Sequence, residues 1–167
     1  MLRPANPADI GFVRSLAARP ENAGFLTDED EAALAGYLTD PAARMLIWGQ
    51  DDPRGFAIFC DIGFPSGAVC LMRLALADPG QGEGKDFLRH LVDYGFQTLG
   101  AQRLWLDASG GNIRAQKAYV RAGFTLEGRL RQHEYVPRTG QVIDQLFYGI
   151  LRPEWEASRT GSPIRSP

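Results

Sequence analysis

The sequence predicts a single α/β (α+β) domain with a mixed, mostly antiparallel central sheet of about six to seven strands, flanked by about four helices. Apolar runs separated by strong turn signals fill the middle and the end of the chain. Amphipathic stretches of helical period lie before and between these runs. One of those stretches joins two apolar runs, which implies a parallel strand pair with a right-handed crossover. With 167 residues and 44% hydrophobic content, the chain fits one substantial core.

Composition narrows the function classes. The formal net charge of −2 gives no reason to expect a nucleic-acid partner. Without a long apolar run or an apolar signal core, we expect no membrane partner and a cytoplasmic location. Cys60 and Cys70 lie in apolar runs without a metal-ligand spacing, so we expect free structural thiols and no metal. The domain is expected over residues 1–155, and a loose, disordered tail over 156–167.

The first part of the chain is expected to hold a short edge strand at 1–3 and two helices. Asn6 is placed to cap the first helix, with Pro7 at its first position. Thr27 opens what resembles a capping box for the second, and the acidic residues that follow suit the positive end of a helix dipole. We expect the loop between these helices to form one lip of a substrate site.

Strands dominate from residue 44 onward. Apolar runs at 45–49, 55–64 and 67–77 are separated by turn signals and predict an antiparallel meander. A further strand is expected over 103–107. A final hairpin is expected from 124–136 and 141–150.

A glycine turn between strand 67–77 and the next helix is the central feature. Gly80, Gly82 and Gly84 stand at alternate positions, and an amphipathic run then continues to Leu99. In a strand, glycine turn and helix, backbone N–H groups and the positive end of the helix dipole face one small volume. Such a volume suits a phosphate or pyrophosphate, and glycine lets the backbone approach closely.

Three phosphate-binding patterns compete for this turn. A Walker A loop fails because Pro79 occupies its first glycine and Asp86 its hydroxyl position. A dinucleotide fingerprint fails because its third glycine falls on Lys85. The acyl-CoA turn, Gln/Arg-x-x-Gly-x-Gly/Ala, is matched at its end by Gly82-Glu83-Gly84, with Pro79 at the usual Gln/Arg position and Gln81 two places on. A glycine turn without a ligand is the alternative.

A second motif follows at 112–124. It reads Asn-x-x-Ala-x-x-x-Tyr-x-x-x-Gly-Phe, an amphipathic helix with Asn112 at its start and Gly123 as a stop signal. The glycine turn and this segment together resemble the cofactor-binding core of the GNAT superfamily of acyl-CoA N-acyltransferases. The resemblance covers roughly residues 44–155.

The end of the chain resembles the RimJ/RimL-like branch of that superfamily, whose members acetylate protein N-termini, polyamines and other small amines. This match rests on Glu127-Gly128, Leu130-Arg131, Asp144 and the run from Ile150 to Trp155. The resemblance implies a GNAT-like fold and an N-acetyltransferase that moves acetyl from acetyl-CoA directly to a primary amine in a ternary complex. A catalytically silent CoA-binding sensor or scaffold and a nucleotide-binding protein are the alternatives. The intact Tyr119 disfavours the first, and the failed glycine patterns disfavour the second.

The resemblance also implies roles for individual residues. The main chain of Leu74, Ala75 and Leu76 would pair with the pantetheine amides, and Asn112 would bond the pantetheine arm or act as a plain helix cap. Tyr119 would protonate the leaving thiolate or serve as a core tyrosine. Lys85, Lys117 or Arg121 would meet the adenosine phosphate. Backbone N–H groups for the pyrophosphate would come from Gln81, Gly82, Glu83, Gly84 and Lys85.

No general base is evident from the sequence, and a water chain to bulk solvent would also serve. A backbone N–H near Leu76 is expected to donate to the developing oxyanion. The acceptor, a small-molecule amine or a peptide N-terminus, is expected to meet the loops at 20–27, 62–67 and 135–141. Monomer and homodimer are both open. Candidate bases on strands are Asp61, Asp107, His133, Glu134 and Asp144.

Overall fold

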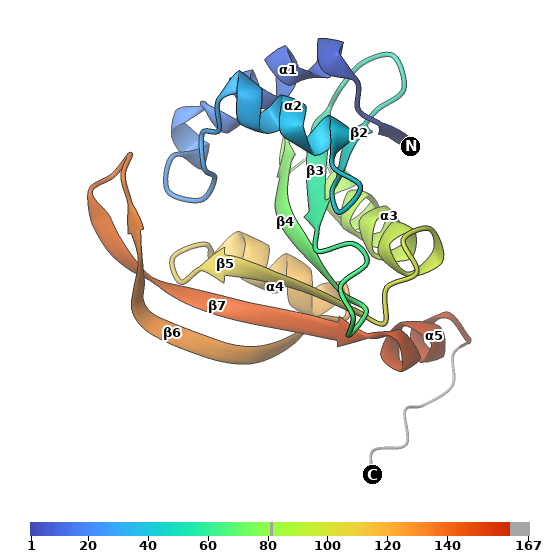
Figure 1. Cartoon of the computed structure of the whole chain (residues 1–167). Coiled ribbons are helices and arrows are strands. Elements are labelled where there is room, and N and C mark those ends of the chain that lie inside the picture. Colours follow the sequence, from blue (N-terminus) through green and yellow to red (C-terminus); the bar gives the residue numbers. More distant parts are fainter. Residues whose placement is uncertain (81, 161–167) are drawn as a thin grey trace.

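One seven-stranded mixed sheet organises the molecule, as the sequence predicts (Figure 1). The computed structural model describes residues 1–80 and 82–160. Strand order is β1-β2-β3-β4-β5-β7-β6, and every neighbouring pair is antiparallel except β4 and β5. The bounds are β1 (Leu2–Pro4), β2 (Arg44–Trp48), β3 (Gly55–Cys60), β4 (Ala68–Leu76), β5 (Arg103–Ser109), β6 (Thr125–Val136) and β7 (Gln141–Leu151).

Helices cover both faces of the sheet. On one face, α1 (Ile10–Ala17) and α2 (Glu31–Thr39) pack on β2 and β3 through a cluster that includes Val13, Ile47 and Ile58. On the other, α3 (Glu83–Gln97) and α4 (Ile113–Arg121) share a larger core with Phe59 and Leu104. Side chains alternate along β3 because successive strand residues point to opposite faces. The remaining helices are η1 (Pro7–Asp9), η2 (Pro20–Asn22) and α5 (Arg152–Thr160). Over the described residues, none of the helices is both long and apolar enough to cross a bilayer.

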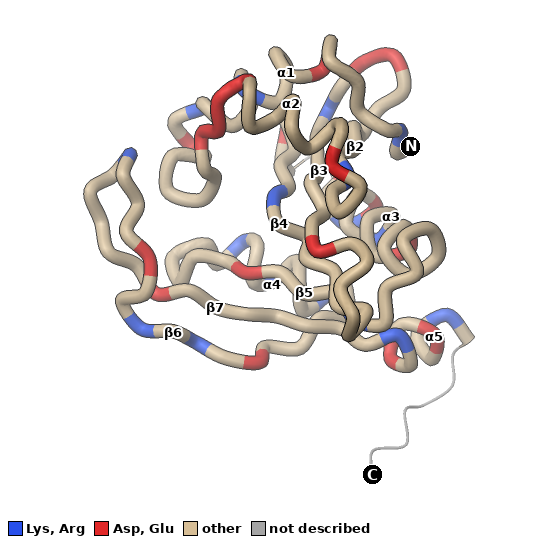
Figure 2. The backbone as a smooth tube through the Cα atoms, in the orientation of Figure 1, with Lys and Arg blue, Asp and Glu red and all other residues tan. Residues whose placement is uncertain are grey.

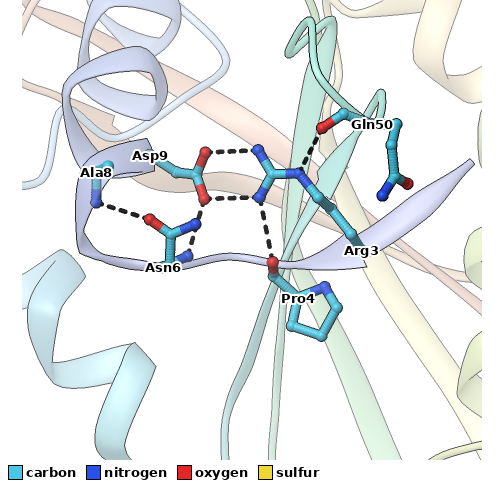
Figure 3. Close-up of polar contacts among 6 residues, drawn as sticks. All are labelled: Arg3, Pro4, Asn6, Ala8, Asp9 and Gln50. Carbon is cyan, nitrogen blue, oxygen red and sulfur yellow. Dashed lines mark hydrogen bonds and ion pairs between the residues drawn. The ribbon is translucent and has the colours of Figure 1, made fainter.

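The predicted start of the first helix is present, with a 3₁₀ turn before α1 (Figure 3). Asn6 Oδ1 accepts from the Ala8 N–H at 2.9 Å, and Asp9 Oδ2 accepts from the Asn6 N–H at 2.8 Å. Arg3 donates to both carboxylate oxygens of the buried Asp9, at 2.7 and 2.8 Å. These bonds from Arg3 hold the pKa of Asp9 below its usual range. The ion pair ties β1 to the helices that overlie the sheet.

The second helix begins later than the sequence suggests. Asp30 is its N-cap, accepting from the Ala33 N–H at 2.8 Å, so the capping box expected at Thr27 was wrong. The carboxylate of Asp30 takes the capping role, and Thr27 lies in the loop against β4, where its hydroxyl accepts from Arg73 Nη2 at 3.0 Å. Thr27 therefore fastens the loop between η2 and α2 to β4.

Helix α5 continues to Thr160, five residues into the stretch expected to be a loose tail from Glu156. Trp155 stacks on Phe96 of α3, with ring centroids 5.0 Å apart. The Arg159 guanidinium lies over the Trp155 ring and pairs with Asp93 at 3.0 Å. A ring buried on α3 and a cation above it hold the helix in place. Residues 161–167 of the expected tail lie outside the described residues.

Candidate functional site

The parallel strands β4 and β5 diverge at the centre of the sheet. They pair only from Ala68↔Arg103 to Cys70↔Trp105. Beyond this point β4 stays with β3 and β5 stays with β7. The register of β4 on β3 shifts at Met72, and such a bulge bends a strand. One edge of β4 from Leu71 onward is therefore free of strand partners among the described residues, and its backbone groups can pair with an extended ligand.

A cavity of about 1040 Å³ lies at this divergence. The second half of β4, the glycine turn and the first turns of α3 line one side. The end of β5 and helix α4 line the other. The loop 22–28, together with Glu134 and residues 136–138 of the β6–β7 hairpin, completes it. Its apolar lining includes Leu74, Leu76, Phe87, Leu88, Ala115 and Ala118.

The glycine turn presents the start of α3 to this cavity. Gly80 has φ 126° and Gly82 has φ 84°, both in the left-handed region that favours glycine. Gly82 is the N-cap of α3, and among the described residues its position supplies no side-chain cap to the first-turn N–H groups. Both Gly82 and Gly84 line the cavity. The geometry is that of an anion site at a helix N-terminus.

Most of the residues that the sequence assigned to a cofactor surround this one cavity: Leu74, Ala75, Leu76, Gly82, Gly84, Lys85 and Asn112. The Glu83 side chain is held outside this lining, where it accepts from Trp48 Nε1 at 3.3 Å and pairs with Arg54. Only the backbone of Glu83 can face an anion there. Gln81 lies outside the described residues.

Asn112 acts as the N-cap of α4. Its Oδ1 accepts from the Ala115 N–H at 3.1 Å. The acceptor oxygen is therefore used by the helix, and only the side-chain NH₂ remains to donate into the cavity. Asn112 can therefore cap α4 with its oxygen and contact a ligand with its NH₂ group.

Cationic side chains line the same cavity. They are Lys85, Arg89, Arg114, Arg121 and Arg159, together with Arg73 of β4 and Arg138 of the β6–β7 hairpin. Arg89 is paired with Asp86 at 3.3 Å and Arg159 with Asp93 at 3.0 Å. Lys117, an expected phosphate contact, is not among the lining residues. Arg114 and Arg121 lie seven residues apart, hence on one face of α4, and this spacing is the signal that could have found Arg114.

Tyr119 of α4 is buried, at 7% exposure, and lines the cavity. Its ring packs edge-on against Tyr148, with centroids 5.7 Å apart. Burial, with smaller contributions from Asp107 and Tyr148, raises the pKa of the phenol well above its usual value. The hydroxyl therefore keeps its proton at neutral pH and can donate it.

Two of the five candidate bases, Asp107 and Glu134, line the cavity. Asp107 projects from β5 at the divergence and is exposed to the cavity. Surrounding protein atoms raise the pKa of its carboxyl by desolvation, opposed by a hydrogen bond from Gln145 and the charge of Arg73. A carboxylate with a raised pKa beside a protonated phenol is a pairing suited to acid–base chemistry.

The other candidate bases, Asp61, His133 and Asp144, do not line the cavity. The Asp144 carboxylate accepts from the Gln132 N–H at 2.8 Å and from Arg129 Nε at 2.7 Å. These bonds lower the pKa of Asp144, as befits a structural ion pair.

Cys60 and Cys70 are free thiols that face each other across β3 and β4. With Asp61 they place one potential metal-ligand atom each within 4.8 Å of the others. Spacing along the chain does not reveal this cluster, because the pairing of β3 with β4 brings its members together. None of these three residues lines the cavity.

The acceptor loops were only partly anticipated. Residues 22–28, Glu134 and 136–138 line the cavity and overlap two of the three expected loops, 20–27 and 135–141. Residues 62–67 do not, because they precede the paired end of β4, where Gly67 O accepts from the Gln102 N–H at 2.8 Å. That end of the parallel pair is closed.

Comparisons with known proteins agree with this geometry. The family model described as Acetyltransferase (GNAT) family matches residues 10–124. A putative ribosomal N-acetyltransferase YdaF of Bacillus subtilis is 33% identical over 81 residues, which span 46% of this chain and 43% of that protein. This chain thus matches less than half of the length of that relative. An uncharacterized N-acetyltransferase of Mycobacterium bovis, Mb2688, is 33% identical over 67% of this chain and 73% of its own length.

Among solved structures, spermidine N-acetyltransferase from Vibrio cholerae in complex with CoA and spermine superimposes with a TM-score of 0.83 at 19% identity. The match covers 93% of this chain and 97% of that one. A dodecameric structure of the Vibrio enzyme gives a TM-score of 0.77 at 20% identity, over 93% of this chain and 95% of that one. At these identities the likeness shows a shared fold.

Proposed function

Because this chain belongs to the acetyltransferase (GNAT) family, we propose that it transfers an acetyl group from acetyl-CoA directly to a primary amine, without a covalent enzyme intermediate. The observation that carries the proposal is the divergence of β4 and β5 beside the N-terminus of α3. Around one cavity lie the N-terminus of α3, the side chains of Asp107 and Tyr119, and the edge of β4 that has no strand partner among the described residues, and this grouping supports the proposal.

The residues present fit acetyl-CoA. The free edge of β4 at Leu74, Ala75 and Leu76 suits the amides of the pantetheine arm, and the Asn112 NH₂ can donate to it. The N–H groups from Gly82 to Lys85 suit the pyrophosphate at the helix N-terminus. Arg114 and Arg121 add positive charge on the α4 side of the cavity. When bound, acetyl-CoA supplies the activated acetyl group.

The acid–base roles follow from the two perturbed groups. Asp107 takes the proton from the amine as its nitrogen bonds to the acetyl carbon. Tyr119 gives its proton to the sulfur as the carbon–sulfur bond breaks, so that amide and free thiol are the products. A backbone N–H near Leu76 stays our prediction for the donor to the thioester oxygen.

Charge at the acceptor end favours a cationic amine. Asp28, Asp107 and Glu134 line the cavity there beside Arg73 and Arg138, whose guanidinium groups donate to backbone carbonyls and to the Thr27 hydroxyl rather than to these carboxylates. Figure 2 shows acidic segments both before α2 and on the β6–β7 hairpin. Carboxylates around a cavity attract an ammonium group. We therefore propose a small polyamine-like acceptor, in line with the spermine named for the Vibrio structure, ahead of a protein N-terminus. A cytoplasmic location and a homodimer stay predictions.

Thermal unfolding with and without acetyl-CoA, CoA, ATP and NAD, followed by a thiol-release assay, tests this proposal. Ligands that bind the folded state raise the unfolding midpoint by mass action. We expect a shift with acetyl-CoA and CoA alone, and thiol release that depends on spermidine or spermine more than on a peptide with a free N-terminus. A shift without thiol release would indicate a silent CoA-binding module. A larger shift with ATP or NAD would overturn the proposal.

A further inference from the structure

The tip of the β6–β7 hairpin is fastened to the end of α1, more than a hundred residues away in sequence. Arg138 Nη1 donates to the Ala17 carbonyl and Nη2 to the Ala18 carbonyl, each at 2.9 Å. A third contact, Nη2 to the Arg19 carbonyl, is 3.5 Å long. These are carbonyls at the C-terminus of α1, where helices leave acceptors unsatisfied and the dipole favours a cation.

A bend in the β6–β7 hairpin brings its tip to the end of α1. Figure 1 shows β6 and β7 curving from the sheet toward the loop that follows α1. The register of β6 on β7 shifts between Leu130 and Glu134, and Gln132 has φ 49°, in the left-handed region. Asp144 of β7 fixes this bulge by accepting from the Gln132 N–H and from Arg129. The curvature is thus built into the strands.

The end of α1 that Arg138 binds also contacts the residue that follows β4. Arg19, at the same end of α1, donates to the Ala77 carbonyl just after β4. Residues 134, 136, 137 and 138 of the hairpin and 22–28 of the loop line one cavity from two sides. The end of α1 therefore joins the hairpin tip to the strand whose free edge faces that cavity.

We propose that Arg138 is a positioning residue for acceptor specificity: by binding the C-terminus of α1 it closes the hairpin over the cavity and sets Glu134 against the acceptor amine. The inference rests on the proposed function and names the residue that positions the hairpin at the acceptor end of the cavity. The cofactor contacts on β4, α3 and α4 do not involve the hairpin. Loss of the contact should therefore weaken the use of acceptor and spare that of acetyl-CoA.

Steady-state kinetics of Arg138→Ala, with Arg138→Lys and Arg131→Ala beside it, test the inference. We expect Arg138→Ala to raise the KM for spermidine about tenfold while the Kd for acetyl-CoA stays unchanged, because a displaced positioning group is costly to substrate alignment. In Arg138→Lys the ammonium group can still donate to the carbonyls at the C-terminus of α1, so we expect a KM for spermidine close to that of the wild type. Arg131 is exposed on the same hairpin but does not line the cavity, so its variant should behave as wild type.

A second readout separates this inference from the proposed function. Amide hydrogen exchange over residues 18–28 should become faster in Arg138→Ala than in wild type or Arg131→Ala, whether or not any amine is acetylated. If exchange is faster in Arg138→Ala but the wild type acetylates no amine, the contact of Arg138 with α1 is supported and the proposed acetyltransferase activity is contradicted. An Arg138→Ala variant with unchanged exchange and unchanged KM would overturn the inference, as would an equal loss in the affinities for acceptor and acetyl-CoA.

Discussion

Tyr119→Phe should lower kcat about 100-fold, since a positioned general acid contributes roughly 10²–10⁴-fold to a rate. The substitution removes one oxygen from a buried ring and leaves its packing on Tyr148 and Phe124 in place. Affinity for acetyl-CoA should stay at the wild-type value. Because burial raises the pKa of this phenol, the wild type should show no loss of rate from Tyr119 ionisation up to about pH 10, the ordinary tyrosine value.

Thiol-release kinetics over a pH series, with Tyr148→Phe as control, measure this effect. Tyr148 is buried against Tyr119 but is not a lining residue of the cavity, so its variant loses a neighbouring hydroxyl without the proposed acid. A Tyr119→Phe enzyme with wild-type kcat would show that Tyr119 is only a core residue.

Asp107→Asn should lower kcat/KM by about 100-fold at neutral pH, the lower end of what a general base supplies. The base must be ionised, so wild-type activity that depends on it is lost as pH falls through its pKa, which desolvation by the surrounding protein atoms raises above the ordinary Asp value. The variant should lack that part of the acid limb. A raised carboxyl pKa means that the fold disfavours the charged form, so Asp107→Asn should not lower the free energy of unfolding.

Glu134→Gln is the matched comparison for Asp107→Asn. Glu134 also lines the cavity, but it lies on the hairpin rather than at the strand divergence. We expect its loss to raise the acceptor KM and to leave kcat nearly intact. If Glu134→Gln lost kcat and Asp107→Asn kept it, the base would have been assigned to the wrong carboxylate.

The sequence predicted the parts of the site that local pattern controls. The glycine turn and the Asn112 to Phe124 segment combine short-range spacing with helix periodicity, and most of the residues chosen from them surround one cavity. The order of strands followed from turn signals and from the helix that joins β4 to β5.

The remaining features depend on contacts between distant segments. Thr27 lies in the loop, bound by Arg73 of β4, while Asp30 caps α2. Helix α5 extends to Thr160, with Trp155 stacked on Phe96 of α3. The choice of Asp107 over Asp144 required the cavity itself, since both are strand carboxylates in sequence. In the sequence Arg138 is an ordinary turn residue. Its role depends on the bend of the β6–β7 hairpin, which brings its guanidinium group to the end of α1.

Amide hydrogen exchange on the wild-type protein, with and without acetyl-CoA, tests most directly whether the divergence of β4 and β5 is the cofactor site. We predict slower exchange in the second half of β4, over Leu74 to Leu76, and in the first turn of α3, because an extended ligand and its phosphates would occupy those N–H groups. The N-terminal strand β1 and the outer part of α2 should be unaffected. Protection that spares β4 and α3, or that appears only elsewhere, would contradict the account.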